Sequence, residues 1–171
     1  MDFTLGTYKI LLNALIDQGF SFLTFNDYIS NSAGKNIVLR HDVDLLPANS
    51  LEFARLQSNI GIKGTYNFRL VPESFNENII TEIAGMGHEI GYHYEDLSFA
   101  YAKLRAEGVP IAIGRRKAVG EELEKLVVDI GLDLFRGNLE KLRRIVPVRT
   151  ICMHGSPLNR WDSRLLWKYY D

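Results

Sequence analysis

The chain lacks the features that mark several classes of protein. It has one cysteine in 171 residues, so no internal disulfide can form and nothing indicates an oxidising compartment. It has no uninterrupted apolar run of membrane-spanning length and no recognisable signal peptide. It also lacks an excess of positive charge, because 20 Lys and Arg face 21 Asp and Glu. We therefore expect a cytoplasmic protein that binds neither membranes nor nucleic acid.

The composition is that of an ordinary globular domain. Hydrophobic residues make up 46% of the chain and charged residues 24%, and no repeat or linker divides it. One domain spanning residues 1–171 is the simplest interpretation. The last residues are aromatic, with Trp167, Tyr169 and Tyr170 close together. We expect either that C-terminal elements are missing from this chain, or that a second copy covers this aromatic helix in a homo-oligomer.

Apolar and β-branched residues alternate along the chain with stretches of helical periodicity. Five strands are expected, at residues 20–25, 36–40, 65–69, 89–92 and 148–153, and the second of them reads as buried. Helices are expected around residues 10–18, 47–57, 74–86, 97–107, 117–145 (interrupted near Gly131 or Gly137) and 161–170. Strands that alternate with helices favour parallel βαβ units. Because a closed eight-stranded barrel usually needs about 250 residues, we expect an α/β fold with an incomplete or distorted (β/α) barrel.

Acidic side chains follow the second expected strand. Asp42 and Asp44 are two residues apart, so in an extended backbone both project to the same face, within reach of one ion. Two carboxylates this close repel each other unless a cation or a proton lies between them. The alternative is that one of them caps the helix that begins near Pro47. We favour metal or acid–base chemistry for the pair.

Three histidines lie near strand ends. His93 ends the fourth expected strand and is a candidate metal ligand together with Asp44. His88 lies at the start of that strand, where a structural role is expected. His154 follows the fifth strand and is a candidate general acid, or else a residue that fixes a loop.

Two further residues near these strands leave their roles open. Arg69 ends the third expected strand, where it either binds a substrate oxygen or neutralises Asp42. Cys152 lies inside the fifth strand and is interpreted as a small buried apolar residue, not as a nucleophile.

These stretches together resemble the polysaccharide deacetylase family, the NodB-homology domain of carbohydrate esterase family 4. The segment 38–44 (VLRHDVD) resembles its first motif in the Asp-Xaa-Asp form, and 64–68 (GTYNF) resembles the strand that follows. The segment 87–93 (GHEIGYH) resembles the approach to the second motif, and Met153-His154 the last one. The resemblance covers about residues 36–157.

The resemblance implies a distorted (β/α) barrel and metal-dependent removal of acetyl groups from N-acetylated sugars. It assigns Asp42 as the general base, His154 as the general acid, and Asp44 and His93 as ligands of a divalent metal, which we expect to be zinc. In the family a second histidine follows the first by four residues, and here that position is Leu97. The third ligand is left open among Asp96, Glu95 and His154. The family's Arg-Xaa-Pro motif has no counterpart, and the segment 136–138 (RGN) is the nearest candidate.

The leading hypothesis is therefore a metal-dependent hydrolase of carbon–nitrogen bonds other than peptide bonds, acting on an N-acetylated sugar or polysaccharide. A hydrolase of another amide, such as a ureide, would use the same groups. The alternative is a non-catalytic relative that binds a glycan or serves as a structural module, since a fold can persist after its chemistry is lost. Leu97, in place of a metal ligand, is the residue that suggests this alternative.

Overall fold

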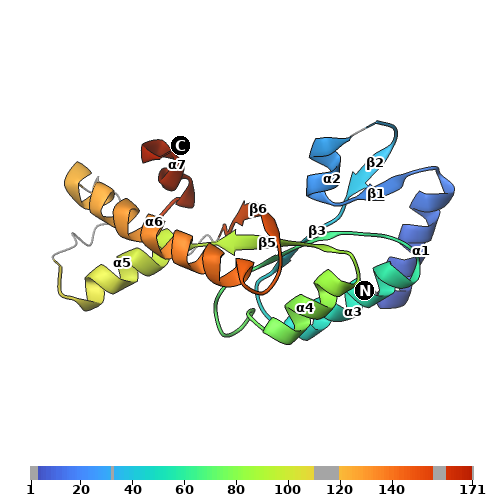
Figure 1. Cartoon of the computed structure of the whole chain (residues 1–171), viewed down its shortest axis with the longest axis horizontal. Helices are drawn as coiled ribbons and strands as arrows, with labels where there is room; N and C mark the ends of the chain where they lie inside the picture. Colours follow the sequence, from blue (N-terminus) through green and yellow to red (C-terminus); the bar gives the residue numbers. More distant parts are fainter. Residues whose placement is uncertain (1–3, 32, 110–119, 156–160, 171) are drawn as a thin grey trace. The chain divides into compact units, whose positions relative to one another are not determined.

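The computed structural model describes residues 4–31, 33–109, 120–155 and 161–170 of the chain (Figure 1). In chain order its elements are α1 (Leu5–Asp17), β1 (Ser21–Leu23), α2 (Phe25–Ser30), β2 (Asn36–Val38), β3 (Arg40–Val43), α3 (Pro47–Asn59), β4 (Thr65–Phe68), α4 (Glu77–Gly85), β5 (Glu89–Tyr94), α5 (Asp96–Ala106), α6 (Glu121–Arg143), β6 (Val148–Met153), the 3₁₀ turn η1 (Ser163–Leu165) and α7 (Leu166–Tyr169).

The chain divides into two units, which are described separately. The first unit comprises Met1–His93 and Leu142–Cys152, and the second comprises Tyr94–Lys141 and Met153–Asp171. The expected α/β class is confirmed, with parallel strands in two sheets. None of the helices described is both long and apolar enough to cross a membrane.

The strands follow one another across the sheets in sequence order. β1 pairs with β2 in parallel, and the four-stranded sheet has the order β3-β4-β5-β6, with parallel β3–β4 and β4–β5 pairs. The expected strand 36–40 was wrong in two respects. It is interrupted at Leu39, so β2 and β3 belong to different sheets, and residues 36–39 are only half-buried. Counting β2 and β3 as one interrupted strand recovers the five expected strands in sequential order, as in a singly wound βαβ array.

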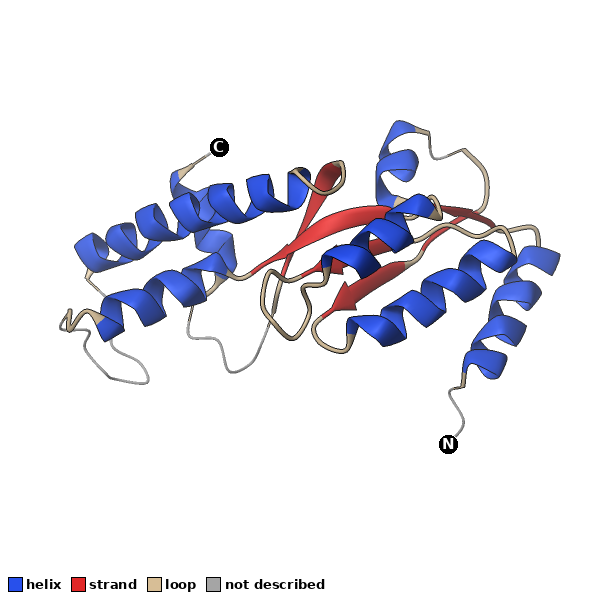
Figure 2. Cartoon of the chain, turned by 60° about the horizontal axis from the view of Figure 1, so that its bottom comes forward, coloured by secondary structure: helices blue, strands red, loops and turns tan. Residues whose placement is uncertain are grey.

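One face of the four-stranded sheet is apolar and is covered by helices. Alternation along the strands places the buried residues Val43, Tyr66, Phe68, Ile90 and Tyr92 on this face. Helices α3 and α4 lie side by side against it (Figure 2), and they contribute apolar residues that include Leu51, Ala54, Ile80 and Ile83. Burial of these side chains is the main force that holds the helices to the sheet.

The other face of the same sheet is polar. Alternation brings together the side chains of Arg40, Asp42, Thr65, Asn67, Glu89, His93, Thr150 and Cys152. Glu89 of β5 links β4, β6 and α2. Its carboxylate accepts hydrogen bonds from Thr65 Oγ1 (2.8 Å), Thr150 Oγ1 (2.9 Å) and the backbone N–H of Asn26 (3.1 Å). A half-buried carboxylate satisfied in this way orders the strands that form this polar face.

A buried polar network lies on the helix-covered face. Gln57 Nε2 donates to Tyr8 Oη (2.7 Å) and to His41 Nε2 (2.7 Å), and Tyr66 donates to Gln57 Oε1 (2.8 Å). Because Gln57 Nε2 can only donate, His41 Nε2 must be an unprotonated acceptor. The His41 ring also stacks on Tyr66 at 4.3 Å. Burial is the main reason why the pKa of His41 falls from 6.5 to about 4, and the nearby His88 lowers it further.

This network predicts a loss of stability in mild acid. The unfolded chain protonates His41 below pH 6.5, whereas the folded chain keeps it neutral until about pH 4. Stability is therefore complete above pH 6.5 and declines as the pH falls toward 4, by roughly 3 kcal/mol from this residue. Urea denaturation in EDTA, at a series of pH values, measures the slope. His41→Asn should flatten it, and an unchanged slope in that variant would contradict the assignment.

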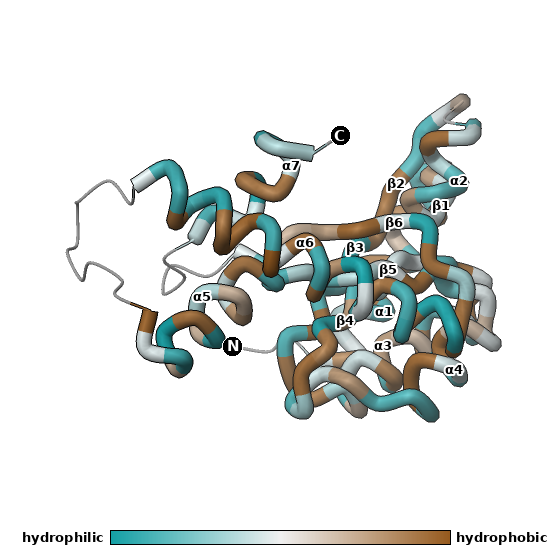
Figure 3. Tube along the Cα trace, turned by 60° about the vertical axis from the view of Figure 1, so that its left-hand side comes forward, coloured by the Kyte–Doolittle hydropathy of each residue, from teal (hydrophilic) through white to brown (hydrophobic). Residues whose placement is uncertain are grey.

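In the second unit, α5 packs closely on α6 at a glycine. An added Cβ on Gly131 would lie 2.5 Å from Leu97 Cδ2, and Leu97 is completely buried. The expected interruption of this helix was wrong: α6 runs continuously through Gly131 and Gly137, and apolar residues recur along it turn by turn (Figure 3). Residues 117–119 of that expected helix lie outside the described residues. Gly131 is therefore a packing contact within the helix and not a breaker.

The aromatic C-terminal segment has partners within its own unit. Trp167 donates to Tyr94 Oη (2.8 Å) and meets the rings of Tyr94 and Phe135 edge-on, at 6.0 and 5.6 Å. The expected helix over 161–170 is shorter than expected and consists of η1 and α7. Trp167 remains 41% exposed, and an oligomer formed through this helix stays a prediction.

Two glycines of α6 give a matched test of the α5–α6 contact. Gly137→Ala enters open space and should stabilise the protein by about 1 kcal/mol, because alanine favours a helix over glycine. Gly131→Ala should lose this gain to overpacking against Leu97, which typically costs 1–3 kcal/mol. Chemical denaturation compares the two variants, and equal stabilisation by both would show that the contact is not tight.

Candidate metal centre

The two acidic residues lie at the carboxyl end of β3. Asp42 is inside the strand and Asp44 directly follows it. Neither caps α3, which contradicts the capping alternative: Leu46 occupies that position in a left-handed conformation (φ 54°) without a side-chain cap, and Pro47 begins the helix as expected. A non-glycine residue in this region of φ and ψ carries backbone strain. The strained turn follows directly on Asp42 and Asp44.

Asp42 is held by side chains of its own and the neighbouring strand. Arg40 Nε donates to Oδ1 (2.9 Å) and Arg40 Nη2 to Oδ2 (2.5 Å), while Asn67 Nδ2 donates to Oδ1 (3.0 Å). Burial alone would raise the pKa of Asp42, but the hydrogen bonds from Arg40 and Asn67 outweigh it, so the pKa lies below its usual value. Asp42 is therefore an ionised, firmly oriented carboxylate.

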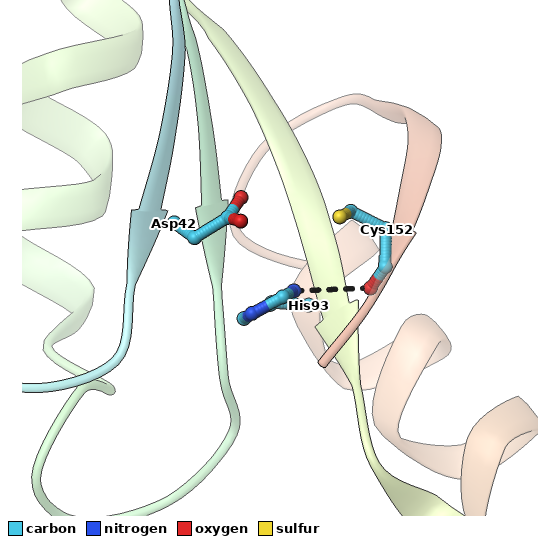
Figure 4. Close-up of side chains that lie close together, drawn as sticks. All are labelled: Asp42, His93 and Cys152. Atoms are coloured by element: carbon cyan, nitrogen blue, oxygen red, sulfur yellow. Dashed lines mark hydrogen bonds between the residues drawn. The ribbon is translucent and has the colours of Figure 1, made fainter. Parts of the chain in front are cut away.

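His93 is buried and fixed by one hydrogen bond to β6 (Figure 4). Its Nδ1 lies 3.1 Å from the carbonyl oxygen of Cys152. A carbonyl only accepts, so Nδ1 carries the proton of this hydrogen bond and Nε2 is the ring nitrogen that can act as an acceptor or as a metal ligand. A backbone carbonyl that orients a histidine in this way is the usual outer partner of a metal-binding imidazole.

The second ring nitrogen of His93 faces Asp44. His93 Nε2 lies 3.4 Å from Asp44 Oδ1, longer than the usual N–H···O hydrogen bond of 2.7–3.2 Å. Two ligands bound to one tetrahedral zinc ion, at bond lengths of 2.0–2.2 Å, are separated by about 3.4 Å. Asp44 and His93 are therefore spaced as two ligands of one ion. The sequence-based pairing of these two residues agrees with the geometry of the first unit.

Asp44 is placed by backbone contacts of its turn. Arg69 Nη1 donates to the carbonyl oxygen of Asp44 (3.1 Å), and the Ser74 hydroxyl donates to that of Val43. Of the two roles left open for Arg69, this contact matches neither: the guanidinium holds the backbone of the turn that carries Asp44. His88 has the structural role expected of it, since its Nδ1 accepts from Gly64 N–H (3.0 Å) and its Nε2 donates to the Ala54 carbonyl (3.0 Å).

Cys152 approaches the same cluster from β6. Ligand atoms of Asp42, His93 and Cys152 all lie within 4.8 Å of one another (Figure 4). The residue is half-buried and not fully buried as expected from the sequence. Burial, and next the charge of Asp42, raise the pKa of its thiol to about 11, so without a cation it is protonated and not a nucleophile at neutral pH.

Gly91 leaves the space in which Asn67 reaches Asp42. Asp42, Asn67 and Gly91 are direct partners across β3, β4 and β5. An added Cβ on Gly91 would lie 2.0 Å from Asn67 Oδ1 and 3.1 Å from Thr150 Oγ1. Only glycine leaves room for the Asn67 amide, which in turn positions Asp42. The sequence analysis did not predict that Arg40 and Asn67 bond to Asp42. The contact of Arg40 could have been predicted, because Arg40 and Asp42 are two residues apart in a strand and so share a face.

The other candidate residues belong to the second unit. His154 Nε2 lies 3.9 Å from Glu95 Oε2, and its backbone N–H donates to the Tyr94 carbonyl (2.9 Å). Asp96 is completely buried and accepts a hydrogen bond from Asn138 (2.7 Å). Asn138, the last residue of the 136–138 segment, therefore bonds to the first residue of α5. The roles of His154, Glu95 and Asp96 in catalysis or metal binding stay predictions.

Two cavities of the first unit bear on where the site is. The smaller has a volume of about 100 Å³ and is lined by Arg40 and Asn67, which bond to Asp42, and by Cys152. Its apolar walls include Phe25, Val38 and Ile151. A larger one of about 330 Å³ lies around Lys63, His88 and Arg149, by the amino end of β5. We place the candidate site next to the smaller cavity, because its lining residues Arg40 and Asn67 bond to Asp42 and its Cys152 bonds to His93. Active sites of βα folds also lie at the carboxyl ends of strands.

Comparison of the chain with protein-family models, with curated proteins and with solved structures finds no match in any of the three.

The role of Gly91 is tested by adding a single methyl group. Gly91→Ala should displace Asn67, break its hydrogen bond to Asp42 and cost about 1–3 kcal/mol of stability. Gly85→Ala, which meets only open space at the end of α4, is the control and should not destabilise the fold. Chemical denaturation measures both, and a Gly91→Ala protein as stable as the parent would contradict the packing argument.

Proposed function

We propose that the chain is a metal-dependent hydrolase of carbon–nitrogen bonds that removes an acetyl group from an N-acetylated sugar or polysaccharide. The observation that carries the proposal is the separation of 3.4 Å between Asp44 Oδ1 and His93 Nε2, with Nδ1 of the same ring committed to the Cys152 carbonyl. Carboxylate and imidazole are a ligand combination that suits zinc, and the residues therefore fit the group. The resemblance to the polysaccharide deacetylase motifs supplies the substrate class.

A bound divalent ion would polarise the acyl carbonyl and lower the pKa of a water molecule. Asp42 would accept the proton of the attacking water, a role that suits a carboxylate kept ionised by Arg40 and Asn67. Arg40 also orients this carboxylate through two hydrogen bonds, which fixes the direction from which a proton is accepted. The resemblance assigns protonation of the departing amine to His154.

The small cavity lined by Arg40 and Asn67, the residues that bond to Asp42, is consistent with a short acyl group. Its volume of about 100 Å³ accommodates only a few non-hydrogen atoms, and its walls combine apolar side chains with the donors Arg40 and Asn67. An acetyl group presents one methyl and one carbonyl oxygen, which match such a lining.

One observation favours the second candidate, a non-catalytic glycan-binding relative. Leu97, at the position where the family has a metal-binding histidine, is completely buried against Gly131 and has a packing role. A protein of this kind would bind the glycan equally well with and without metal. A deacetylase would release acetate only in the metal-loaded form.

Asp42→Asn separates catalysis from metal binding. The amide keeps the size of the side chain but accepts protons poorly, so acetate release from N-acetylglucosamine oligomers should fall by about 10²–10⁴-fold while zinc stays bound. Asp133→Asn, at a residue whose side chain is 84% exposed on α6, is the matched control and should retain full activity. Unchanged turnover in Asp42→Asn with zinc bound would exclude Asp42 as the base.

A further inference from the structure

The proposed metal centre is short of one protein ligand. Asp44 and His93 supply two, and Leu97 does not supply a third because it is packed against Gly131. Catalytic zinc sites usually have three protein ligands and keep the fourth position open. The inference that follows rests on the proposed metal centre and concerns where its third ligand comes from.

Cys152 is the residue of the first unit that the fold brings to this position. β6 neighbours β5, and the carbonyl of Cys152 is the acceptor that orients His93. The thiol of the same residue lies within 4.8 Å of ligand atoms of both His93 and Asp42. Three strand spacings separate β3 from β6, which is about 14 Å in a flat sheet at 4.7–4.9 Å for each spacing. The ligand atoms of Asp42 on β3 and Cys152 on β6 nevertheless lie within 4.8 Å of each other.

The cluster around the Cys152 thiol would carry excess negative charge if the thiol were ionised, and a cation would neutralise it. Asp42 and Asp44 both act on Cys152, and Arg40 is the basic side chain that opposes them. A thiolate, two carboxylates and one guanidinium carry a net charge of −2 when the thiol is ionised. A divalent cation would neutralise this cluster, which is the condition under which a thiolate beside two carboxylates becomes stable.

We propose that Cys152 is the third protein ligand of the ion, bound as a thiolate beside Asp44 and His93, with Asp42 left to act as the base. On binding, the S–H bond of Cys152 breaks, a sulfur–metal bond forms, and the proton passes to Asp42 and then to solvent. The thiol is grouped with His93 and Asp42, so this ligand set requires the Cys152 side chain to turn toward Asp44 when the ion binds, while its backbone carbonyl keeps His93 in place. The sulfur ligand makes the site selective for Zn²⁺ and Co²⁺ over Mg²⁺ and Mn²⁺.

Co²⁺ provides a direct test, because it absorbs light when a thiolate binds it. The chain has one cysteine, so such an absorption band can come only from Cys152. Addition of Co²⁺ to the metal-free protein should produce a sulfur-to-cobalt charge-transfer band in the near ultraviolet that saturates at one ion per chain. Zn²⁺ should remove the band by competition, whereas Mg²⁺ should not. Alkylation of Cys152 by iodoacetamide should slow by at least about tenfold when Zn²⁺ is bound, since the metal-bound thiolate is shielded.

Cys152→Ser is the decisive variant, since it replaces sulfur by oxygen with little change in volume. It should abolish the charge-transfer band and weaken zinc binding by about 100-fold or more, given that even outer partners of ligands contribute 10- to 100-fold. Its urea denaturation in EDTA should match that of the parent, which shows that the fold is intact. Asp133→Asn again serves as the control and should keep both the band and the affinity.

The outcomes separate this inference from the proposed function. Tight binding of Co²⁺ and acetate release without a sulfur band would overturn the role of Cys152 and leave the hydrolase standing. A sulfur band without acetate release would support Cys152 as a ligand and count against the hydrolase. Failure of the metal-free protein to bind Zn²⁺ or Co²⁺ at all would overturn both.

Discussion

The hydrogen bond between His93 Nδ1 and the carbonyl of Cys152 is the constraint on which the rest of the site depends. It joins β5 to β6 and decides which nitrogen of the imidazole faces Asp44. With Nδ1 committed, Nε2 faces Asp44 at 3.4 Å, and the pair has the spacing of two ligands of one ion. Without that bond the ring could rotate, and neither its tautomer nor its direction would be defined.

On the polar face of the sheet, further hydrogen bonds fix the side chains around His93. Gly91 leaves space for Asn67, Asn67 and Arg40 hold Asp42, and Glu89 ties β4, β6 and the start of α2 together. Each of these polar groups has its hydrogen-bond partner, so the face tolerates burial without unpaired charges. The apolar core on the opposite face supplies the stability that such a polar surface does not.

The sequence was sufficient for the elements whose signals are local. Strands β4, β5 and β6 were predicted within two residues of their ends, and Pro47 was correctly placed at the start of α3. Asp44 and His93 were paired because parallel strands gather their carboxyl ends. The break at Leu39 was not predicted, since residues 36–43 carry no glycine or proline to mark it.

The features that were missed depend on contacts between distant segments. An interruption of the helix was predicted near Gly131 or Gly137, but Gly131 instead admits the close approach of Leu97, 34 positions earlier in the chain. Asn67 and Glu89 gain their roles only from the register across β3, β4, β5 and β6, which the sequence does not specify. Cys152 was read as an apolar strand residue because nothing in its neighbours along the chain indicates the carboxylates that it faces.

The most direct test of the account is a crystal structure of the protein soaked in zinc, with anomalous scattering recorded at the zinc edge. The account predicts one strong anomalous peak within bonding distance of Asp44 and of His93 Nε2, with His93 Nδ1 still bonded to the Cys152 carbonyl. The absence of a peak there, or an ion bound elsewhere while this position holds only water, would contradict it.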